Sequence, residues 1–335
     1  MKNINSLFFL SFFCLTAYVS SAQTEGTFAE RLGFPKGKKV VILHVDDAGM
    51  SFDSNNGAMD ALTKGVSSSC SVMMPCPWVP GFLHFLKDHP QIDAGLHLTL
   101  TSEWNAYRWG PLSGKAKVPG LVDKEGAMWP SVEEAVKHAS ADEVETEIRA
   151  QLDRALTAGF KPTHLDSHMG TLFATEAFTE RYIKVGVEYK IPLMFPGGHN
   201  TLIKKQMGAG NEALNRAQAV GKMLWNAGLP VLDDLHNESY DWKLPLGIKP
   251  VKEAIRQSKT AYYKQALEEV KPGLTMVIMH CTNPTEVFSS ISDSGITREG
   301  DWLAMTDPEL KKYIEKEGII LTTWRELMER RNKVK

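Results

Sequence analysis

The chain has 335 residues, a net charge of −2 at pH 7, 43% hydrophobic residues and 23% charged residues. This is ordinary globular composition with enough length for a sizeable core, and no linker divides the chain. The near-neutral charge argues against a general nucleic-acid or membrane-surface binder, because no basic block is present to neutralise phosphates.

The N-terminal residues have the pattern of a secretory signal. Lys2 precedes an apolar run from Leu7 to Val19, and small residues end at Ala22. The run is shorter than the roughly 20 apolar residues that span a membrane. We therefore expect residues 1–22 to be cleaved and the protein to be exported, periplasmic or secreted, with no membrane attachment afterwards. A retained N-terminal membrane anchor is the alternative.

Export leaves three cysteines in the mature chain, Cys70, Cys76 and Cys281. Three cysteines make no disulfide framework, although a bridge between Cys70 and Cys76 is permitted. The sequence has no CxxC pair, so a structural zinc ribbon is not expected.

Short apolar runs recur along the chain, and their near-continuous Val, Ile, Leu and Met content is typical of parallel strands buried on both faces. The predicted strands are Lys39–Val45, Val66–Met74, Ile92–Leu100, Pro162–His168, Ile191–Phe195, Leu229–Leu235, Leu274–His280 and Gly318–Trp324.

Helical patterns separate these runs. The clearest helix starts at Ser140 as N-cap, has Glu143 as the partner in a capping box, and ends at Gly159. A second, Thr306–Gly318, has proline near its start and glycine at its end. The alternation predicts a single TIM-like (β/α) barrel of seven to eight mostly parallel strands over residues 23–335, with an open doubly wound sheet as the alternative.

Polar residues that bear chemistry end four of the predicted strands. Because the carboxyl ends of barrel strands form one face, these residues should meet at one site. They are Asp46 and Asp47 on the first strand, His97 on the third, His164, Asp166 and His168 on the fourth, and His280 on the seventh. The long aperiodic stretch Thr101–Pro130 is expected to be a functional loop over this face.

Two neutral imidazoles and one carboxylate form a three-ligand site for Zn²⁺ or a similar divalent ion. Such an ion activates water, a second carboxylate accepts its proton, and a separate histidine protonates the leaving group. Each feature alone has a simpler interpretation: Asp46-Asp47 as a turn or helix cap, and His97 as a buried, satisfied histidine. Their joint placement on strand ends favours the metal site.

The motifs "HVDDAGMS", "GLHLTLT", "THLDSHMG" and "VIMHC" resemble, in this order, those of the YdjC-like carbohydrate deacetylases, from about Lys38 to the C-terminus. The resemblance implies an irregular (β/α) barrel and a divalent metal, Zn²⁺ or Mg²⁺. It also implies removal of acetyl groups from N-acetylated amino sugars such as chitooligosaccharides.

Carried over by position, the resemblance implies Asp46 as general base and Asp47, His97 and His168 as metal ligands. It implies His280 as the acid that protonates the departing amine.

The chain departs from the family pattern at two places. Family members often have further histidines after the position of His168, where this chain has Met169-Gly170-Thr171. They also often have Pro-Gly after the acid, where this chain has Cys281-Thr282.

Further candidates have less specific signals. Asp166 and His164 are candidates for substrate contact or for support of a metal ligand. Trp104, Arg108 and Trp109 could stack on or hydrogen-bond a sugar ring, with loop packing as the alternative. Asp233, Asp234 and His236 mark another strand end and are candidates for substrate contact, with capping and packing as the simpler interpretation. His44 gains no support from the motif and is left out of the predicted site.

The sequence thus predicts an exported metal-dependent deacetylase of an N-acetylated or O-acetylated carbohydrate. Its predicted partner is an acetylated oligosaccharide, not nucleic acid, and a homodimer is compatible with the sequence. A metal-dependent phosphoesterase or other hydrolase on the same barrel is the second hypothesis, with Arg108 as the obvious basic group for phosphate. A sugar-binding protein whose metal site has lost turnover is the third.

Overall fold

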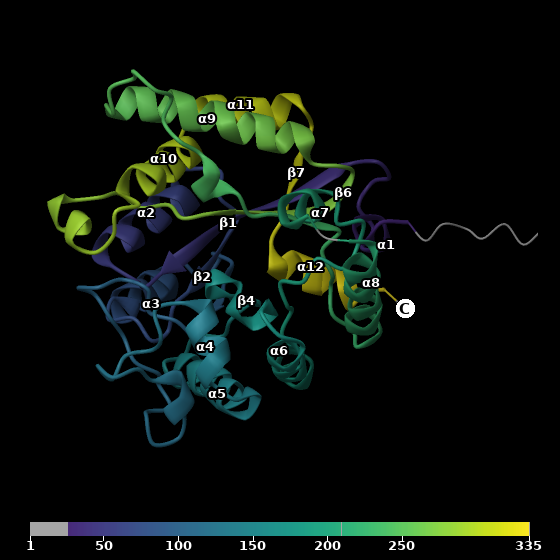
Figure 1. Cartoon of the computed structure of the whole chain (residues 1–335). Helices are drawn as coiled ribbons and strands as arrows, with labels where there is room; N and C mark the ends of the chain where they lie inside the picture. The colour runs from purple at the N-terminus through teal and green to yellow at the C-terminus, as the bar shows by residue number, and fades with distance from the viewer. Residues whose placement is uncertain (1–25, 209, 335) are drawn as a thin grey trace, which may run out of the picture.

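The computed structural model describes residues 26–208 and 210–334, and the predicted signal peptide lies outside this part of the chain. Within it, seven parallel strands form one curled sheet in the order β4-β3-β2-β1-β6-β5, with β7 also paired to β1 (Figure 1). The strands are β1 Lys39–Ala48, β2 Ser69–Val72, β3 Ala94–Leu98, β4 Leu165–Ser167, β5 Asp234–His236, β6 Gly273–Met279 and β7 Ile320–Leu321.

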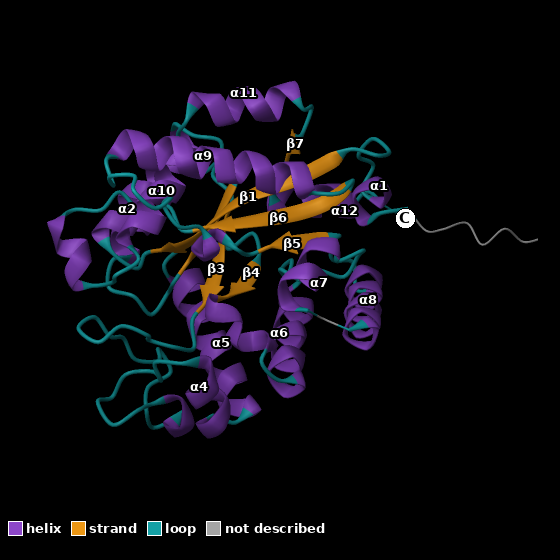
Figure 2. Ribbon diagram, turned by 45° about the horizontal axis from the view of Figure 1, so that its top comes forward, coloured by secondary structure: helices purple, strands orange, loops and turns teal. Residues whose placement is uncertain are grey.

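Helices surround the sheet, with α9 to α11 on one side and α4 to α6 on the other (Figure 2). The predicted capping box at Ser140 and Glu143 is present at the start of α5. The α-helices are α1 Phe28–Arg31, α2 Phe52–Thr63, α3 Val79–Asp88, α4 Val132–His138, α5 Ala141–Thr157, α6 Glu176–Tyr189, α7 Thr201–Met207, α8 Asn211–Asn226, α9 Lys252–Glu269, α10 Gly295–Met305, α11 Pro308–Lys316 and α12 Trp324–Arg331. Short 3₁₀ turns are η1 Pro119–Leu121, η2 His168–Phe173, η3 Ser239–Asp241 and η4 Glu286–Ser290.

The prediction of an irregular (β/α) barrel is confirmed, with one predicted strand reduced to isolated bridges. Leu165 pairs with Leu193, and Pro196 pairs with Leu232, so this segment joins the β4 edge of the sheet to the chain leading into β5. Proline cannot donate to a ladder, and Pro192 and Pro196 therefore interrupt regular pairing over the predicted strand Ile191–Phe195.

The centre of the sheet is β1, which pairs with β6 along Lys39–Val45. Its other edge pairs first with β7 and then with β2. The apolar side chains from Val40 to Leu43 are fully buried, as expected for a strand covered on both faces.

Cys70, Cys76 and Cys281 are buried and free, so the permitted Cys70–Cys76 bridge does not form. No helix among the described residues is long and apolar enough to cross a membrane.

Asp233 ties three segments of the chain together. Its buried carboxylate accepts hydrogen bonds from the backbone N–H groups of Phe28 (2.8 Å) and Ala29 (3.0 Å) in α1 and of Leu274 (2.8 Å) in β6. Asp233, which the sequence made a candidate for substrate contact, therefore fixes α1 to the sheet.

Replacing Asp233 with alanine is expected to lower the free energy of unfolding by about 3 kcal/mol, because three buried N–H groups lose their acceptor. Chemical denaturation monitored by circular dichroism measures this loss. The matched control is Asp153→Ala at an exposed position of α5, which should change stability by no more than about 0.5 kcal/mol. Equal effects of the two substitutions would contradict the structural role of Asp233.

Candidate metal centre

A bulge in β1 lets two adjacent carboxylates, those of Asp46 and Asp47, point into the same histidine cluster. From Val45 to Ala48 the chain advances three residues, while β2 advances only two, from Cys70 to Val72. Asp47 lies in this bulge with a φ of 64°, a conformation that aspartate tolerates better than most residues. In a regular strand, neighbouring side chains point to opposite faces. The bulge removes that restriction for Asp46 and Asp47.

The three predicted metal ligands meet at one point. Asp47 Oδ1 lies 3.3 Å from His97 Nε2 and 3.3 Å from His168 Nδ1. The two imidazole nitrogens are 3.2 Å apart. All three residues are buried, with exposed fractions of 1%, 2% and 4% for Asp47, His97 and His168. They come from β1, β3 and the start of η2, which follows β4 directly.

The protonation pattern of this triad fits a cation. His97 Nδ1 lies 2.7 Å from Asp166 Oδ1, and His168 Nε2 lies 3.1 Å from both Glu103 oxygens. Since carboxylates only accept hydrogen bonds, these nitrogens carry the protons in the neutral rings. The remaining lone pairs of His97 and His168 then face Asp47 Oδ1, which is buried without a hydrogen-bond partner.

The spacing of the triad also suits a metal ion. Ligand atoms about 2.0–2.1 Å from a tetrahedral zinc ion lie about 3.3–3.4 Å from one another. The three separations of 3.2–3.3 Å between Asp47, His97 and His168 match this value. With both rings neutral, these three electron-pair donors face one another and repel unless a cation or an added proton lies among them. The cluster is therefore compatible with a divalent metal.

The electrostatics of the pocket favour positive charge. Burial lowers the pKa of His168, but the carboxylates of Glu103 and Asp47 outweigh it and raise the pKa to about 9. Burial likewise lowers the pKa of His97, but Asp46 and Asp166 raise it well above its usual value. Protons are thus drawn to the atoms that would otherwise bind a cation.

Each ligand is held by one further charged residue, and sequence reasoning missed two of these. Glu103 contacts His168, and Arg298 Nη2 donates a hydrogen bond of 2.6 Å to Asp47 Oδ2. Burial raises the pKa of Asp47, but the buried Arg298 guanidinium helps to hold it well below its usual value. Glu103 follows the "GLHLTLTS" motif and could have been singled out. Arg298 lies in α10, outside every motif quoted.

Asp46 and His280 flank the triad. Asp46 Oδ2 lies 3.8 Å from His97 Nε2 and 3.9 Å from His280 Nε2. His280 Nδ1 is 3.1 Å from the hydroxyl of Ser239, and its backbone N–H donates to Asp301. Burial is the largest influence on His280 and lowers its pKa. A carboxylate and an imidazole thus stand on the rim of the cluster, where base and acid were predicted.

A lower layer of histidines supports Asp46 and Asp166. His44 Nε2 lies 3.1 Å from Asp46 Oδ1 and 2.9 Å from Asp166 Oδ2, so this residue, left out by the sequence, belongs to the site. His164 lies 3.6 Å from the same Asp166 oxygen and stacks on Trp324. With His164 and Asp166 fully or almost fully buried, the geometry favours support of the ligands. Their contact with substrate stays a prediction.

The remaining substrate candidates lie in the loop that follows β3. The Arg108 guanidinium pairs with Asp123 at 2.6 Å and Glu125 at 3.1 Å within that loop. Trp109 is buried and donates from Nε1 to a backbone carbonyl, whereas Trp104 is half-buried and lies 5.7 Å from the Arg298 guanidinium. These contacts hold the loop together, and a role in binding substrate stays a prediction for all three.

At the remaining strand end, Asp234 accepts hydrogen bonds from the backbone N–H groups of Leu202 and Ile203 in the first turn of α7. His236 is buried, with its ring 6.1 Å from that of Tyr262. Asp234 therefore acts as a helix anchor, in line with the simpler interpretation of this strand end.

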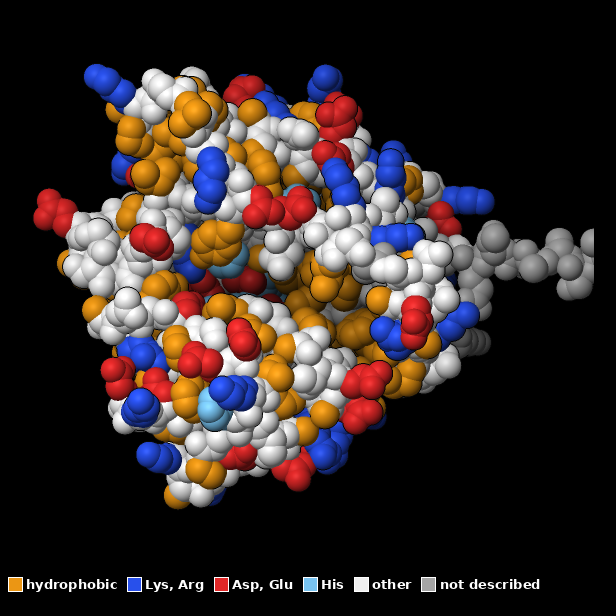
Figure 3. Space-filling model, viewed as in Figure 1, with side chains coloured by type: hydrophobic (Ala, Val, Ile, Leu, Met, Phe, Trp, Pro, Cys, Tyr) orange, Lys and Arg blue, Asp and Glu red, His pale blue; other side chains and the backbone are white. Residues whose placement is uncertain are grey.

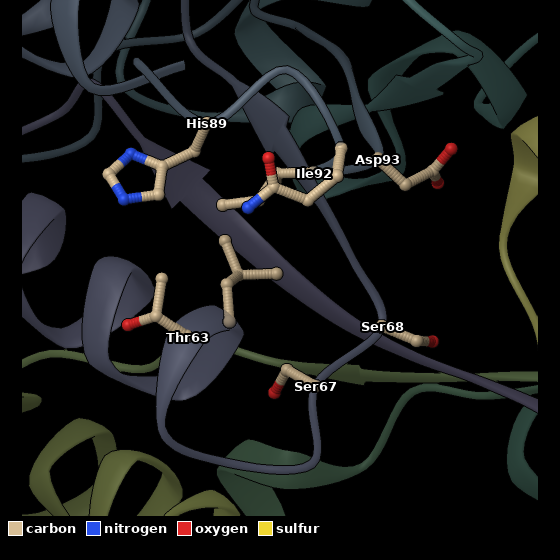
Figure 4. A pocket seen from close by; sticks show the side chains of 8 residues that line it. Thr63, Ser67, Ser68, His89, Ile92 and Asp93 are labelled. Carbon is tan, nitrogen blue, oxygen red and sulfur yellow. The ribbon is translucent and has the colours of Figure 1, made fainter.

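The space-filling view shows acidic and histidine side chains at the bottom of a hollow in the face drawn (Figure 3). A separate pocket of about 340 Å³ lies at the amino ends of β2 and β3, at the opposite end of these strands (Figure 4). Ser67, Ser68, Ile92 and Asp93 line it. It contains none of the residues of the metal centre.

Fold and site together define a parallel (β/α) barrel with an Asp-His-His cluster at the carboxyl ends of its strands. Residues 40–316 match the family model of YdjC-like proteins, and the chain belongs to this family.

Named relatives extend the comparison. Over 300 residues the chain is 31% identical to a carbohydrate deacetylase of Thermus thermophilus, covering 90% of this chain and 97% of that relative. It is 30% identical over 135 residues to a chitooligosaccharide deacetylase of Yersinia enterocolitica, covering 39% and 49% of the two chains. A solved structure from Enterococcus faecalis V583, provisionally named a cellobiose-phosphate cleavage protein, shares the fold with a TM-score of 0.67 at 20% identity. That match covers 87% of this chain and 99% of the other.

Zinc titration of the purified protein tests the triad. His97→Ala and His168→Ala each remove one of three ligand atoms, so zinc affinity should fall by more than about 100-fold, the upper end of what a supporting residue costs. The control is His84→Ala, which removes an exposed histidine of α3 and should leave zinc affinity unchanged. Circular dichroism confirms that each variant is folded. Unchanged zinc affinity in folded His97→Ala would remove His97 from the centre.

Proposed function

We propose that the protein is an exported, metal-dependent carbohydrate deacetylase that hydrolyses an acetyl group on an N-acetylated, or O-acetylated, sugar. The observation that carries the proposal is the triad of Asp47, His97 and His168 with Asp46 and His280 on either side. It supplies three ligand atoms, a carboxylate and an imidazole, joined by contacts of 3.9 Å or less. Relatives named carbohydrate deacetylase and chitooligosaccharide deacetylase support the substrate class.

A divalent cation held by the triad would lower the pKa of a water molecule and polarise the acetyl carbonyl. Asp46 accepts the proton of the attacking water at Oδ2, the oxygen that faces His97 and His280. Asp47 does not take this role, because its Oδ1 faces the two histidine ligands and its Oδ2 is bound to Arg298.

His280 donates a proton to the departing nitrogen, so that amide and water become amine and acetate. Its lowered pKa makes the imidazolium a stronger acid than an exposed one. Ser239 and the backbone contact to Asp301 fix the ring, and Tyr240 lies against it with ring centres 4.5 Å apart. Tyr240 and the half-buried Trp104 are aromatic side chains near the site on which a sugar ring can stack.

No contact among the described residues specifically favours the phosphoesterase hypothesis or the sugar-binding hypothesis. The obvious basic group for a phosphoesterase, Arg108, is paired with two carboxylates of its own loop. A sugar-binding protein without turnover would not need Asp46 and His280 beside the triad.

Purified protein is expected to release acetate from chitooligosaccharides, and a chelator should abolish this release through loss of the cation. A coupled acetate assay before and after dialysis against chelator, with zinc or magnesium added back, measures both effects. Acetate release that persists with no metal in the sample would contradict the metal mechanism.

Asp46→Asn should bind zinc as tightly as the wild-type protein but lose turnover by about 10²–10⁴-fold, because the amide cannot accept the proton of water. Zinc titration and the acetate assay on the same sample separate the two roles. Loss of zinc from Asp46→Asn together with retention in Asp47→Asn would exchange the roles of the two aspartates. His84→Ala again serves as the control with normal zinc binding.

A further inference from the structure

His44 lies directly below the base on the same side of β1. Residues two apart on a strand point to the same face, and His44 and Asp46 are so related. The His44 ring is fully buried, with Nε2 3.1 Å from the Ser71 hydroxyl, 3.1 Å from Asp46 Oδ1 and 2.9 Å from Asp166 Oδ2. Because carboxylate oxygens only accept hydrogen bonds, these two short contacts favour a proton on Nε2, the nitrogen that also lies within hydrogen-bond distance of the Ser71 hydroxyl.

The two carboxylate oxygens depend on this ring. Asp46 Oδ1 and Asp166 Oδ2 are both buried without a hydrogen-bond partner in the described chain. A buried carboxylate without a compensating charge or donor is costly, and His44 Nε2 is the nearest imidazole nitrogen to both oxygens. The ring is itself held, since its edge packs on His164 at 4.9 Å between ring centres and His164 stacks on Trp324 at 5.2 Å.

We propose that His44 is a positioning residue that fixes the Asp46 carboxylate for proton transfer and links it to Asp166, the partner of the ligand His97. This rests on the proposed function. His44 attracts the Oδ1 side of Asp46, and the other oxygen, Oδ2, is thereby directed toward His97 and His280. His44 contacts Asp166 Oδ2, and the other oxygen of the same carboxylate, Oδ1, contacts His97. The orientation of Asp46 is thereby linked through His44 and Asp166 to that of His97.

The test compares His44→Gln, whose amide N–H reaches about the place of Nε2, with His44→Leu, which offers no donor. In His44→Leu we expect kcat on chitooligosaccharides to fall by about 10–100-fold with KM little changed, as for the loss of a supporting residue. His44→Gln should recover most of the loss. Zinc binding should stay at one ion per chain in the wild-type protein and both variants.

A readout apart from activity is the crystal structure of each variant. Asp46 should keep its orientation in His44→Gln and rotate in His44→Leu. The matched comparator is His164→Leu, which removes an equally buried histidine that forms an ion-pair contact with Asp166 and none with Asp46, while the leucine side chain can still pack against the His44 ring. It should destabilise the protein while the Asp46 carboxylate stays in place.

Three outcomes would overturn the proposal. An unmoved Asp46 carboxylate with wild-type kcat in folded His44→Leu would make His44 a packing residue. A second zinc ion in the wild-type protein that is lost in His44→Leu would make it a ligand of a second site with His164 and Asp166. Equal loss of kcat in His44→Gln and His44→Leu would show that an N–H donor at this position is not what supports Asp46. If the wild-type protein releases no acetate from any acetylated glycan, the proposed function fails, whereas the crystal structures still decide whether His44 holds Asp46.

Discussion

The structure depends on the balance of buried charge at the end of the central strand. Asp46, Asp47, Asp166 and Glu103 are buried or partly buried in one cluster, and burying so many carboxylates together is costly without compensating positive charge. Arg298 supplies one fixed charge, and histidines supply protons. The excess of acceptors that remains makes the cluster compatible with a bound cation.

The polar groups of the cluster come from different elements of the barrel. β1 and β3 carry Asp47 and His97, the turn after β4 carries His168, and α10 carries Arg298. Because parallel strands end at the same face, short side chains suffice to reach the common point. In a regular strand, Asp46 and Asp47 would point to opposite faces of the sheet. The bulge in β1 allows both carboxylates to reach the same cluster.

Sequence reasoning found the barrel and the residues that form the triad, because strand-end motifs report directly on a shared face. It missed His44 and Arg298 for different physical reasons. His44 is left out because the motif gives it no support, and only the approach of Asp166 from β4 shows its contacts with charged groups. Arg298 is 251 residues from its partner Asp47, and no local pattern encodes such a pairing. The predicted strand at Ile191–Phe195 likewise failed, although Pro192 within it and Pro196 directly after it already argue against regular pairing.

The positive φ of Asp47 narrows the ways in which this centre can change. The backbone there accepts few residue types at low cost, chiefly glycine, asparagine and aspartate, and only aspartate brings a charged ligand oxygen. In the proposed metal centre, a shift of metal preference would therefore have to come through His97, His168 or the carboxylates that contact them. The bulge thus restricts the residue type at position 47, while the other positions of the proposed centre can vary.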